Sequence, residues 1–165
     1  MERAVIIGSG NLAEALARAV AKSGLKPVQI FARNAARGQQ VAALAGTQWT
    51  ADPAQLAGAD IYLIAVSDRA VAEAAAALPI PAGAVVAHTA GSVPLEALPA
   101  GSVRRAVFYP LQTFTKGREV DFSQIPILLE TDDEALRPEL EAFARRLSRT
   151  VIWACLLYTS DAADE

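Results

Sequence analysis

The chain has 165 residues, a formal net charge of −3 and 53% hydrophobic residues. This length is enough for one domain with a full hydrophobic core. Without a basic block a nucleic-acid role has little support, and no uninterrupted apolar stretch is long enough to span a bilayer. The N-terminus enters an apolar run directly, without a signal-peptide pattern. We therefore expect a cytoplasmic protein with neither a nucleic-acid nor a membrane partner.

The first motif closes the first apolar run, in the segment Val5-Ile6-Ile7-Gly8-Ser9-Gly10-Asn11-Leu12-Ala13. Its Gly-x-Gly-x-x-Ala spacing, followed by helical periodicity over residues 11–23, predicts a strand, a tight turn and a helix. Gly8 permits the turn, Gly10 leaves room for a pyrophosphate, and Ala13 allows close packing. The free N–H groups that begin the helix favour an anion. We predict that a dinucleotide binds along Gly8, Ser9, Gly10, Asn11, Leu12 and Ala13. A turn that binds nothing and an S-adenosylmethionine site are the alternatives.

A cation follows the second predicted strand, residues 28–32. NAD-binding domains carry a carboxylate about 20 residues beyond the glycine turn, where it accepts from the ribose 2′-hydroxyl. Here Arg33 occupies the strand tip, and its guanidinium suits a 2′-phosphate. Arg37, one helical turn further on, is a second cation, and Asn34 either donates to the phosphate or caps the helix predicted at residues 35–44. The sequence therefore predicts NADP rather than NAD, unless Arg33 is only a solvated surface cation.

The middle of the chain predicts a short strand at residues 47–50, a brief helix at 54–57 and a buried central strand at 60–66. The central strand ends at Ser67, and Asp68 is interpreted as the N-cap of a helix over residues 69–78. In a doubly wound sheet this strand lies beside the first strand, where the strand order reverses and a nucleotide sits. Backbone at Val66 and Ser67 is therefore expected to line the cofactor.

The only histidine follows a fifth predicted strand, residues 84–87, in the segment His88-Thr89-Ala90-Gly91-Ser92. Such strand ends approach the nicotinamide half of the cofactor, so His88, Thr89, Ala90 and Gly91 are cofactor-binding candidates. His88 is also the catalytic candidate, because an imidazole there donates to a carbonyl substrate or holds a ribose hydroxyl. The alternative is a strand-end histidine satisfied by local backbone. Ser92 is a substrate-side candidate.

The last third predicts a strand at residues 104–109, a strand at 124–130, a helix through Leu147 and the start of a strand at 151–153. The loop after Pro110 supplies two further substrate-side candidates, Gln112 and Thr113. Pro126 cannot donate to a ladder, so the strand that contains it is expected to be peripheral. No cluster of metal ligands is present, and no metal site is predicted. The alternation of elements predicts an α/β protein with a doubly wound, mostly parallel Rossmann sheet flanked by helices on both faces.

The last eleven residues, 155–165, resemble a translated sequencing adapter. We therefore expect one native domain over residues 1–154 and a natural product that continues beyond Ala154. Excluding this tail removes the only cysteine, Cys155, and with it any disulfide or thiolate chemistry.

Three segments together resemble a known group of proteins: residues 5–13, residues 88–92 and Pro110-Leu111-Gln112-Thr113-Phe114. The group consists of Rossmann-like NADP oxidoreductase-type proteins whose N-terminal domain precedes a helical domain of unknown function. Its distant relatives are pyrroline-5-carboxylate reductases and deazaflavin-dependent NADP oxidoreductases. The resemblance covers residues 1–154. It implies a homodimer that binds a small-molecule substrate between the two domains, and this chain lacks the helical domain, so we do not expect it to be active alone.

Three functions are compatible with these motifs. The first is an NADP-dependent oxidoreductase that transfers a hydride between nicotinamide and a small carbonyl or imine compound, for which the cofactor carries the chemistry. The second is a nucleotide-binding regulatory or interaction module without turnover, because His88 is the one convincing general acid in the sequence. The third, a methyltransferase, predicts an acid where Arg33 stands.

Overall fold

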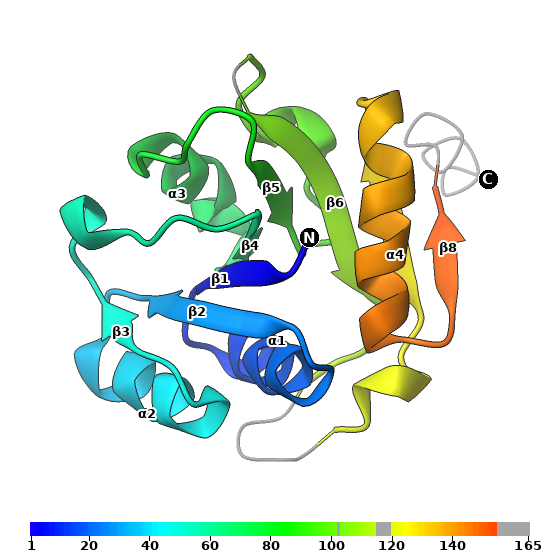
Figure 1. Cartoon of the computed structure of the whole chain (residues 1–165). Helices are drawn as coiled ribbons and strands as arrows, with labels where there is room; N and C mark the ends of the chain where they lie inside the picture. Colours follow the sequence, from blue (N-terminus) through cyan, green and yellow to red (C-terminus); the bar gives the residue numbers. More distant parts are fainter. Residues whose placement is uncertain (102, 115–119, 155–165) are drawn as a thin grey trace.

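The computed structural model describes residues 1–101, 103–114 and 120–154. An eight-stranded sheet with the order β3-β2-β1-β4-β5-β6-β7-β8 runs through the molecule (Figure 1). The strands are β1 (Arg3–Ile7), β2 (Lys26–Phe31), β3 (Trp49–Thr50), β4 (Ile61–Ile64), β5 (Val85–His88), β6 (Arg104–Pro110), β7 (Ile127–Thr131) and β8 (Val151–Trp153). Each strand corresponds to one that the sequence predicts, with ends that differ by a few residues.

In the described residues, four α-helices and five 3-10 turns connect these strands. The helices are α1 (Asn11–Lys22), α2 (Ala35–Ala45), α3 (Val71–Ala77) and α4 (Arg137–Leu147). The 3-10 turns are η1 (Pro53–Gln55), η2 (Asp68–Ala70), η3 (Leu95–Ala97), η4 (Phe122–Gln124) and η5 (Glu134–Leu136). The helix predicted over residues 69–78 is therefore split into η2 and α3.

The strand directions are those of a doubly wound Rossmann sheet with an antiparallel extension. Strands β1 to β6 pair in parallel, with β2 on one side of β1 and β4 on the other. The strand order thus reverses between β1 and β4, where ligands bind in such sheets. Strand β7 is antiparallel to β6 and parallel to β8. The expectation of a peripheral seventh strand was wrong: Pro126 precedes β7, and β7 is paired on both sides.

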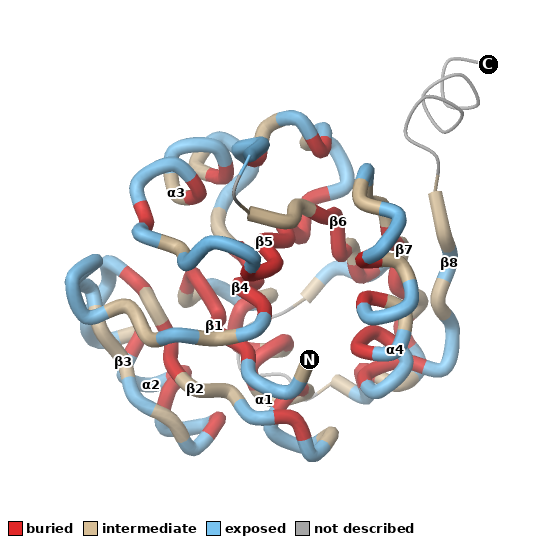
Figure 2. The backbone as a smooth tube through the Cα atoms, turned by 45° about the horizontal axis from the view of Figure 1, so that its top comes forward, coloured by how far each residue is buried: buried red, intermediate tan, exposed pale blue. Residues whose placement is uncertain are grey.

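Both faces of the sheet are covered, because residues along each strand alternate between two cores. Ala4 and Ile6 face a cluster that includes apolar residues of α1, α2 and α4. Val5 and Ile7 face a second cluster with residues of α3 and η3. Figure 2 shows the resulting distribution, with buried residues along the central strands and exposed residues on the outer helices and loops.

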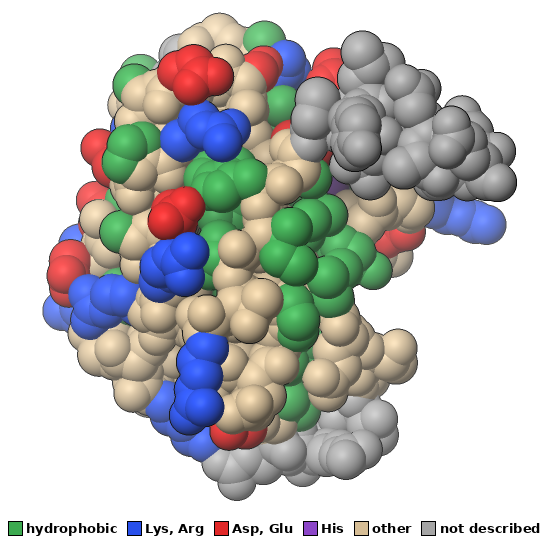
Figure 3. All heavy atoms as spheres, turned by 90° about the vertical axis from the view of Figure 1, so that its right-hand side faces the viewer, with side chains coloured by type: hydrophobic (Ala, Val, Ile, Leu, Met, Phe, Trp, Pro, Cys, Tyr) green, Lys and Arg blue, Asp and Glu red, His purple; other side chains and the backbone are tan. Residues whose placement is uncertain are grey.

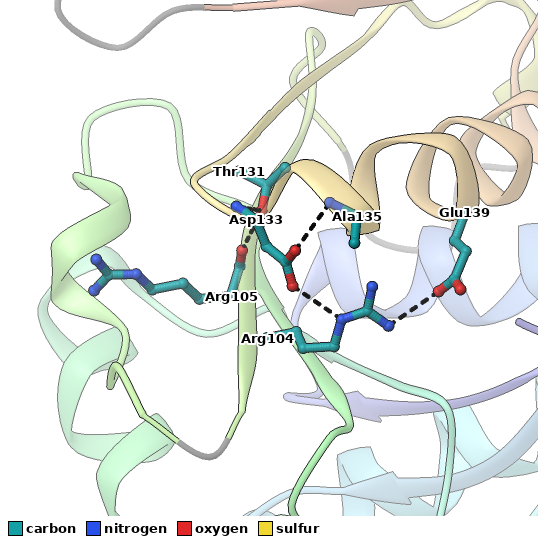
Figure 4. Close-up of polar contacts among 6 residues, drawn as sticks. All are labelled: Arg104, Arg105, Thr131, Asp133, Ala135 and Glu139. Carbon is teal, nitrogen blue, oxygen red and sulfur yellow. Dashed lines mark hydrogen bonds and ion pairs between the residues drawn. The ribbon is translucent and has the colours of Figure 1, made fainter.

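An ion-pair network joins the amino-terminal end of β6 to the segment before α4 (Figure 4). The guanidinium of Arg104 donates to Asp133 at 3.0 Å and to Glu139 at 3.1 Å. Asp133 also accepts from the backbone N–H of Ala135 and so caps η5. Because parallel strands share a direction, this network lies at the end of β6 opposite the carboxyl edge where nucleotides bind.

Figure 3 shows the side of the molecule on the right of Figure 1, where apolar side chains gather beside several Lys and Arg side chains. Within the described part of the chain β8 is an edge strand, and its Ile152 is 41% exposed. Across the same residues, no helix is both long enough and apolar enough to cross a membrane.

Candidate functional site

The turn between β1 and α1 is built around two glycines with different surroundings. Gly8 has φ +127°, and a Cβ at this position would lie 2.2 Å from the carbonyl oxygen of Ala65 in the segment after β4. Gly10 has φ −78°, and a Cβ there would meet no atom within 4 Å. Packing therefore requires glycine at Gly8, whereas at Gly10 a side chain would extend only into open space in front of α1.

The start of α1 presents backbone donors to that space. Gly10 is the N-cap residue and, as a glycine, has no side chain to cap the helix. The first helical hydrogen bond runs from the backbone N–H of Glu14 to the carbonyl of Gly10, at 3.0 Å. The N–H groups of Asn11, Leu12 and Ala13 precede that first helical bond. Such a helix start attracts an anion, because its free donors and the helix dipole act together.

A cleft of about 610 Å³ opens from this turn along the carboxyl ends of β1, β2 and β4. It brings together nine residues predicted from the sequence: Gly8, Ser9, Gly10, Asn11, Leu12, Arg33, Asn34, Val66 and Ser67. The tenth residue of this region, Ala13, is fully buried behind the turn. The cleft thus lies at the switch point of the sheet and is lined by three of the predicted segments.

The remaining wall of the cleft is apolar, and the sequence analysis did not single it out. Ala70, Ala74 and Ala77 of η2 and α3 line one side together with Leu78, and Pro53 of η1 lines another part. The alanines recur at spacings of four and three residues, which places them on one helical face. That periodicity was visible in the sequence, but an alanine-rich face is usually buried core and carries no chemistry that marks it as a site.

Arg33 and Arg37, both predicted to bind a 2′-phosphate, lie in different surroundings. The Arg33 side chain lines the cleft and is 88% exposed. The Arg37 side chain is only 14% exposed and is not among the cleft-lining residues. Its Nη1 lies 2.8 Å from Glu14, whose side chain is 5% exposed. The structure therefore brings Arg33 to the cleft and places Arg37 in an ion pair between α1 and α2.

Asn34 has the capping role that was one of its two predicted functions. Its side-chain oxygen accepts from the backbone N–H of Arg37 at 3.0 Å and begins α2. The cap uses only the side-chain oxygen, so the amide N–H₂ group of Asn34 takes no part in it. The residue also lines the cleft.

His88 is fully buried and lies outside the residues that line the cleft. Its Nδ1 accepts from the backbone N–H of Ala90 at 3.2 Å, which leaves the proton of the neutral ring on Nε2. Nε2 has no hydrogen-bond partner among the described residues. Burial lowers the pKa of His88, while the nearby carbonyls of Pro94 and Val93 and the carboxylate of Asp68 oppose this shift. Because the ring is buried, a substrate reaches it only if the segment that follows His88 moves.

The segment after His88 is tied to the end of β4 by two contacts. Thr89, buried, donates its hydroxyl to the carbonyl of Ile64 at 2.9 Å. The Ser92 hydroxyl donates to the carboxylate of Asp68 at 2.7 Å. The prediction that Asp68 caps the following helix was wrong, because its carboxylate holds Ser92 and neither η2 nor α3 has a side-chain cap.

Four other candidates, Ala90, Gly91, Gln112 and Thr113, are not among the residues that line the cleft. Gly91 is exposed, and a Cβ there would lie 2.4 Å from the ring of Tyr109. Ala90 is 8% exposed. Gln112 and Thr113 are exposed in the segment after β6. This segment contacts the glycine turn, because the side-chain amide of Asn11 donates to the carbonyl of Phe114 at 3.2 Å.

The residues that line the cleft suit the binding of an anion better than proton transfer. Arg33 is the only ionisable side chain among its described lining residues. The described residues also contain no group of three or more His, Cys, Asp or Glu side chains that would hold a metal ion. Donor groups at one end, the open space at Gly10 and an apolar wall fit the pyrophosphate and adenine of a dinucleotide. The fold and cleft together define a nucleotide-binding domain of the Rossmann class.

Comparison with known proteins identifies the family. Residues 3–91 match the family described as NADP oxidoreductase, coenzyme F420-dependent. The chain belongs to this family. No protein with a curated description matches the sequence significantly.

Solved structures agree with this placement. A protein from Bacteroides fragilis that is named as an NADP oxidoreductase is 35% identical to this chain. Its TM-score is 0.86, over 93% of this chain and 60% of that chain. Two more distant structures share the fold. A pyrroline-5-carboxylate reductase from Coxiella burnetii is 19% identical, with a TM-score of 0.65 over 92% of this chain and 58% of its own. A prephenate dehydrogenase from A. aeolicus, solved with NAD+ and hydroxyphenyl propionate, is 14% identical, with a TM-score of 0.77 over 93% and 60%. The chain thus spans about three fifths of the length of these proteins.

Proposed function

We propose that residues 1–154 bind NADP and form the nucleotide-binding part of an oxidoreductase that transfers a hydride between nicotinamide and a small carbonyl or imine compound. The main support is the cleft that joins the open glycine turn at Gly10 to the guanidinium of Arg33. Membership in the NADP oxidoreductase family supports the reaction class and favours it over a regulatory module or a methyltransferase.

In this proposal the residues of the chain bind and orient the cofactor, and the bound nicotinamide supplies the hydride chemistry. The N–H groups at the start of α1 hold the pyrophosphate, because a helix N-terminus stabilises negative charge. Arg33 holds the 2′-phosphate through the planar donors of its guanidinium, with the Asn34 amide beside it. Backbone at Val66 and Ser67 lines the cofactor, and the segment His88–Gly91 faces its nicotinamide half.

We propose that catalysis requires a second domain in addition to residues 1–154. The chain spans about three fifths of its structural relatives. The resemblance of its sequence to two-domain proteins implies a substrate between the domains. We propose that the complete protein is a cytoplasmic homodimer in which Ser92, Gln112 and Thr113 face the substrate. His88 has one of two roles in this proposal. It acts on the substrate after the segment that follows it moves, or it only positions that segment through its hydrogen bond with Ala90. Replacing His88 with Gln in the complete protein separates these roles, since lost turnover at unchanged cofactor affinity supports catalysis.

The proposal is tested by titrating the 165-residue chain with NADPH and NADH, followed by nicotinamide fluorescence. We expect tighter binding of NADPH, and we expect Arg33→Asp to abolish or reverse that preference. The matched control is Arg145→Asp, which reverses an exposed charge paired with Glu141 within α4. Failure of a folded chain and of the complete protein to bind either nucleotide would contradict the proposal, as would an unchanged preference in Arg33→Asp.

A further inference from the structure

One ion pair links the proposed phosphate-binding residue to another element beside the cleft. Nη2 of Arg33 lies 3.6 Å from Oε1 of Glu73 in α3, and the two side chains are 88% and 74% exposed. Arg33 follows β2, whereas Ala70, Ala74 and Ala77 of η2 and α3 line the cleft on its other side. The pair therefore joins the two walls of the cleft at its solvent-exposed rim.

Within the described part of the chain, Glu73 is the acidic side chain that forms an ion pair with Arg33. A phosphate monoester is close to a dianion at neutral pH and uses the same guanidinium donors as a carboxylate. A 2′-phosphate bound to Arg33 would therefore compete with Glu73 and lie a few ångströms from its negative charge. A 2′-hydroxyl, by contrast, is neutral and can donate to a carboxylate.

We propose that Glu73 is a specificity-determining residue, which competes with the 2′-phosphate for Arg33 and reduces the preference for NADP over NAD. This inference rests on the proposed function of the cleft. Because both side chains are largely exposed, water and salt screen the interaction, and Glu73 changes the affinity by a limited factor rather than blocking the site.

The test compares the 165-residue chain with its Glu73→Gln variant in titrations with NADPH and NADH. Removing one charge near a phosphate in water is expected to lower the Kd for NADPH about three- to tenfold. The Kd for NADH is expected to stay the same or to rise slightly. At 0.5 M NaCl the effect on NADPH is expected to shrink, because the Debye length falls to a few ångströms.

Two further arms identify the source of the change. Glu134→Gln removes another exposed carboxylate, which is 93% exposed and paired with Arg137, and is expected to leave both affinities unchanged. Adenosine 2′,5′-bisphosphate, which carries the 2′-phosphate without nicotinamide, is expected to show the same gain in Glu73→Gln as NADPH, while 5′-AMP shows none.

The inference is overturned if NADPH binds the parent chain more tightly than NADH and Glu73→Gln leaves the ratio of the two affinities unchanged. It is also overturned if Glu134→Gln changes that ratio as much. Loss of the preference in Arg33→Asp together with no effect of Glu73→Gln would retain the proposed function and remove the role of Glu73. Binding of neither nucleotide to the folded chain and complete protein would overturn both.

Discussion

At the scale of single residues, Gly8 and Gly10 stand two positions apart and differ in role: packing requires Gly8, and only the proposed cofactor site requires Gly10. An alanine at Gly8 would combine φ +127° with a clash against the Ala65 carbonyl. We expect Gly8→Ala to lower the free energy of unfolding by about 3 kcal/mol or more. Urea denaturation measures this loss, and a variant as stable as the parent would contradict the packing argument.

Gly10→Ala is the matched variant, because its backbone is ordinary and its Cβ would meet nothing. We expect its free energy of unfolding to stay within about 1 kcal/mol of the parent, since alanine is only a poorer N-cap than glycine. Its Kd for NADPH is expected to rise by at least about tenfold, because a methyl group would occupy space reserved for the pyrophosphate. Unchanged NADPH binding in this variant would argue against a nucleotide at the turn.

His88 predicts a pH dependence of stability. Burial lowers the pKa of His88 in the folded protein, so below about pH 6.5 the unfolded chain binds more protons than the folded one. Stability is therefore expected to fall as the pH drops from 7 to 5. In His88→Asn, whose side-chain oxygen can still accept from Ala90 N–H, this part of the pH dependence should disappear. Parallel stability curves for the two proteins between pH 7 and 5 would refute this assignment.

At the scale of elements, the buried pair between Glu14 and Arg37 joins α1 to α2 beside the cleft. Arg37 also contacts Gln40 at 3.1 Å, and its Nη2 is buried without a partner in the described structure. We expect Arg37→Met to lower the free energy of unfolding by about 2–4 kcal/mol, because it leaves a buried carboxylate with only the more distant Arg18 at 3.5 Å.

The same variant decides the role of Arg37 in cofactor binding. A structural cation predicts that NADPH and NADH affinities change together in Arg37→Met, if they change at all. A selective loss of NADPH affinity would assign Arg37 to the 2′-phosphate. Urea denaturation and the two titrations, each also run on Gln39→Met as an exposed control in the same helix, measure both properties.

At the scale of the whole molecule, the proposed nucleotide binding is expected to stabilise the folded state. A ligand that binds only the folded state stabilises it by about 2.7 kcal/mol at 100 times its Kd. For a domain of this size that corresponds to a rise in Tm of about 5–10 °C. We expect NADPH to produce this shift in a thermal melt of the parent chain and, with a Kd about tenfold higher, to produce about half of it or less in Gly10→Ala at the same concentration. Equal shifts in both proteins would place the nucleotide elsewhere.

Most elements and the glycine turn could be predicted from the sequence, because their signals are local. The periodicity of residues 11–23 predicts α1, the apolar run at 60–66 predicts β4, and the spacing after Gly8 predicts the anion-binding turn. The strand order follows from the known behaviour of alternating strands and helices in α/β proteins. Arg33 reaches the cleft as expected because it stands at the carboxyl end of a parallel strand.

Contacts between distant segments were decided only by the tertiary structure. Aspartate is a common helix-capping residue, and Asp68 stands just before a helix. Its carboxylate nevertheless accepts a hydrogen bond from the Ser92 hydroxyl, because the ends of β4 and β5 lie side by side. Arg37 stands one turn from Arg33, yet it pairs with Glu14 because α1 and α2 pack on the same face of the sheet. The strand at 127–131 became internal because β8 pairs with its other side. The sequence by itself determined most elements, the fold class and the glycine turn, since these depend on residues near one another in the chain. The partners of each charged side chain depend on how the elements pack, and only the folded molecule shows that packing.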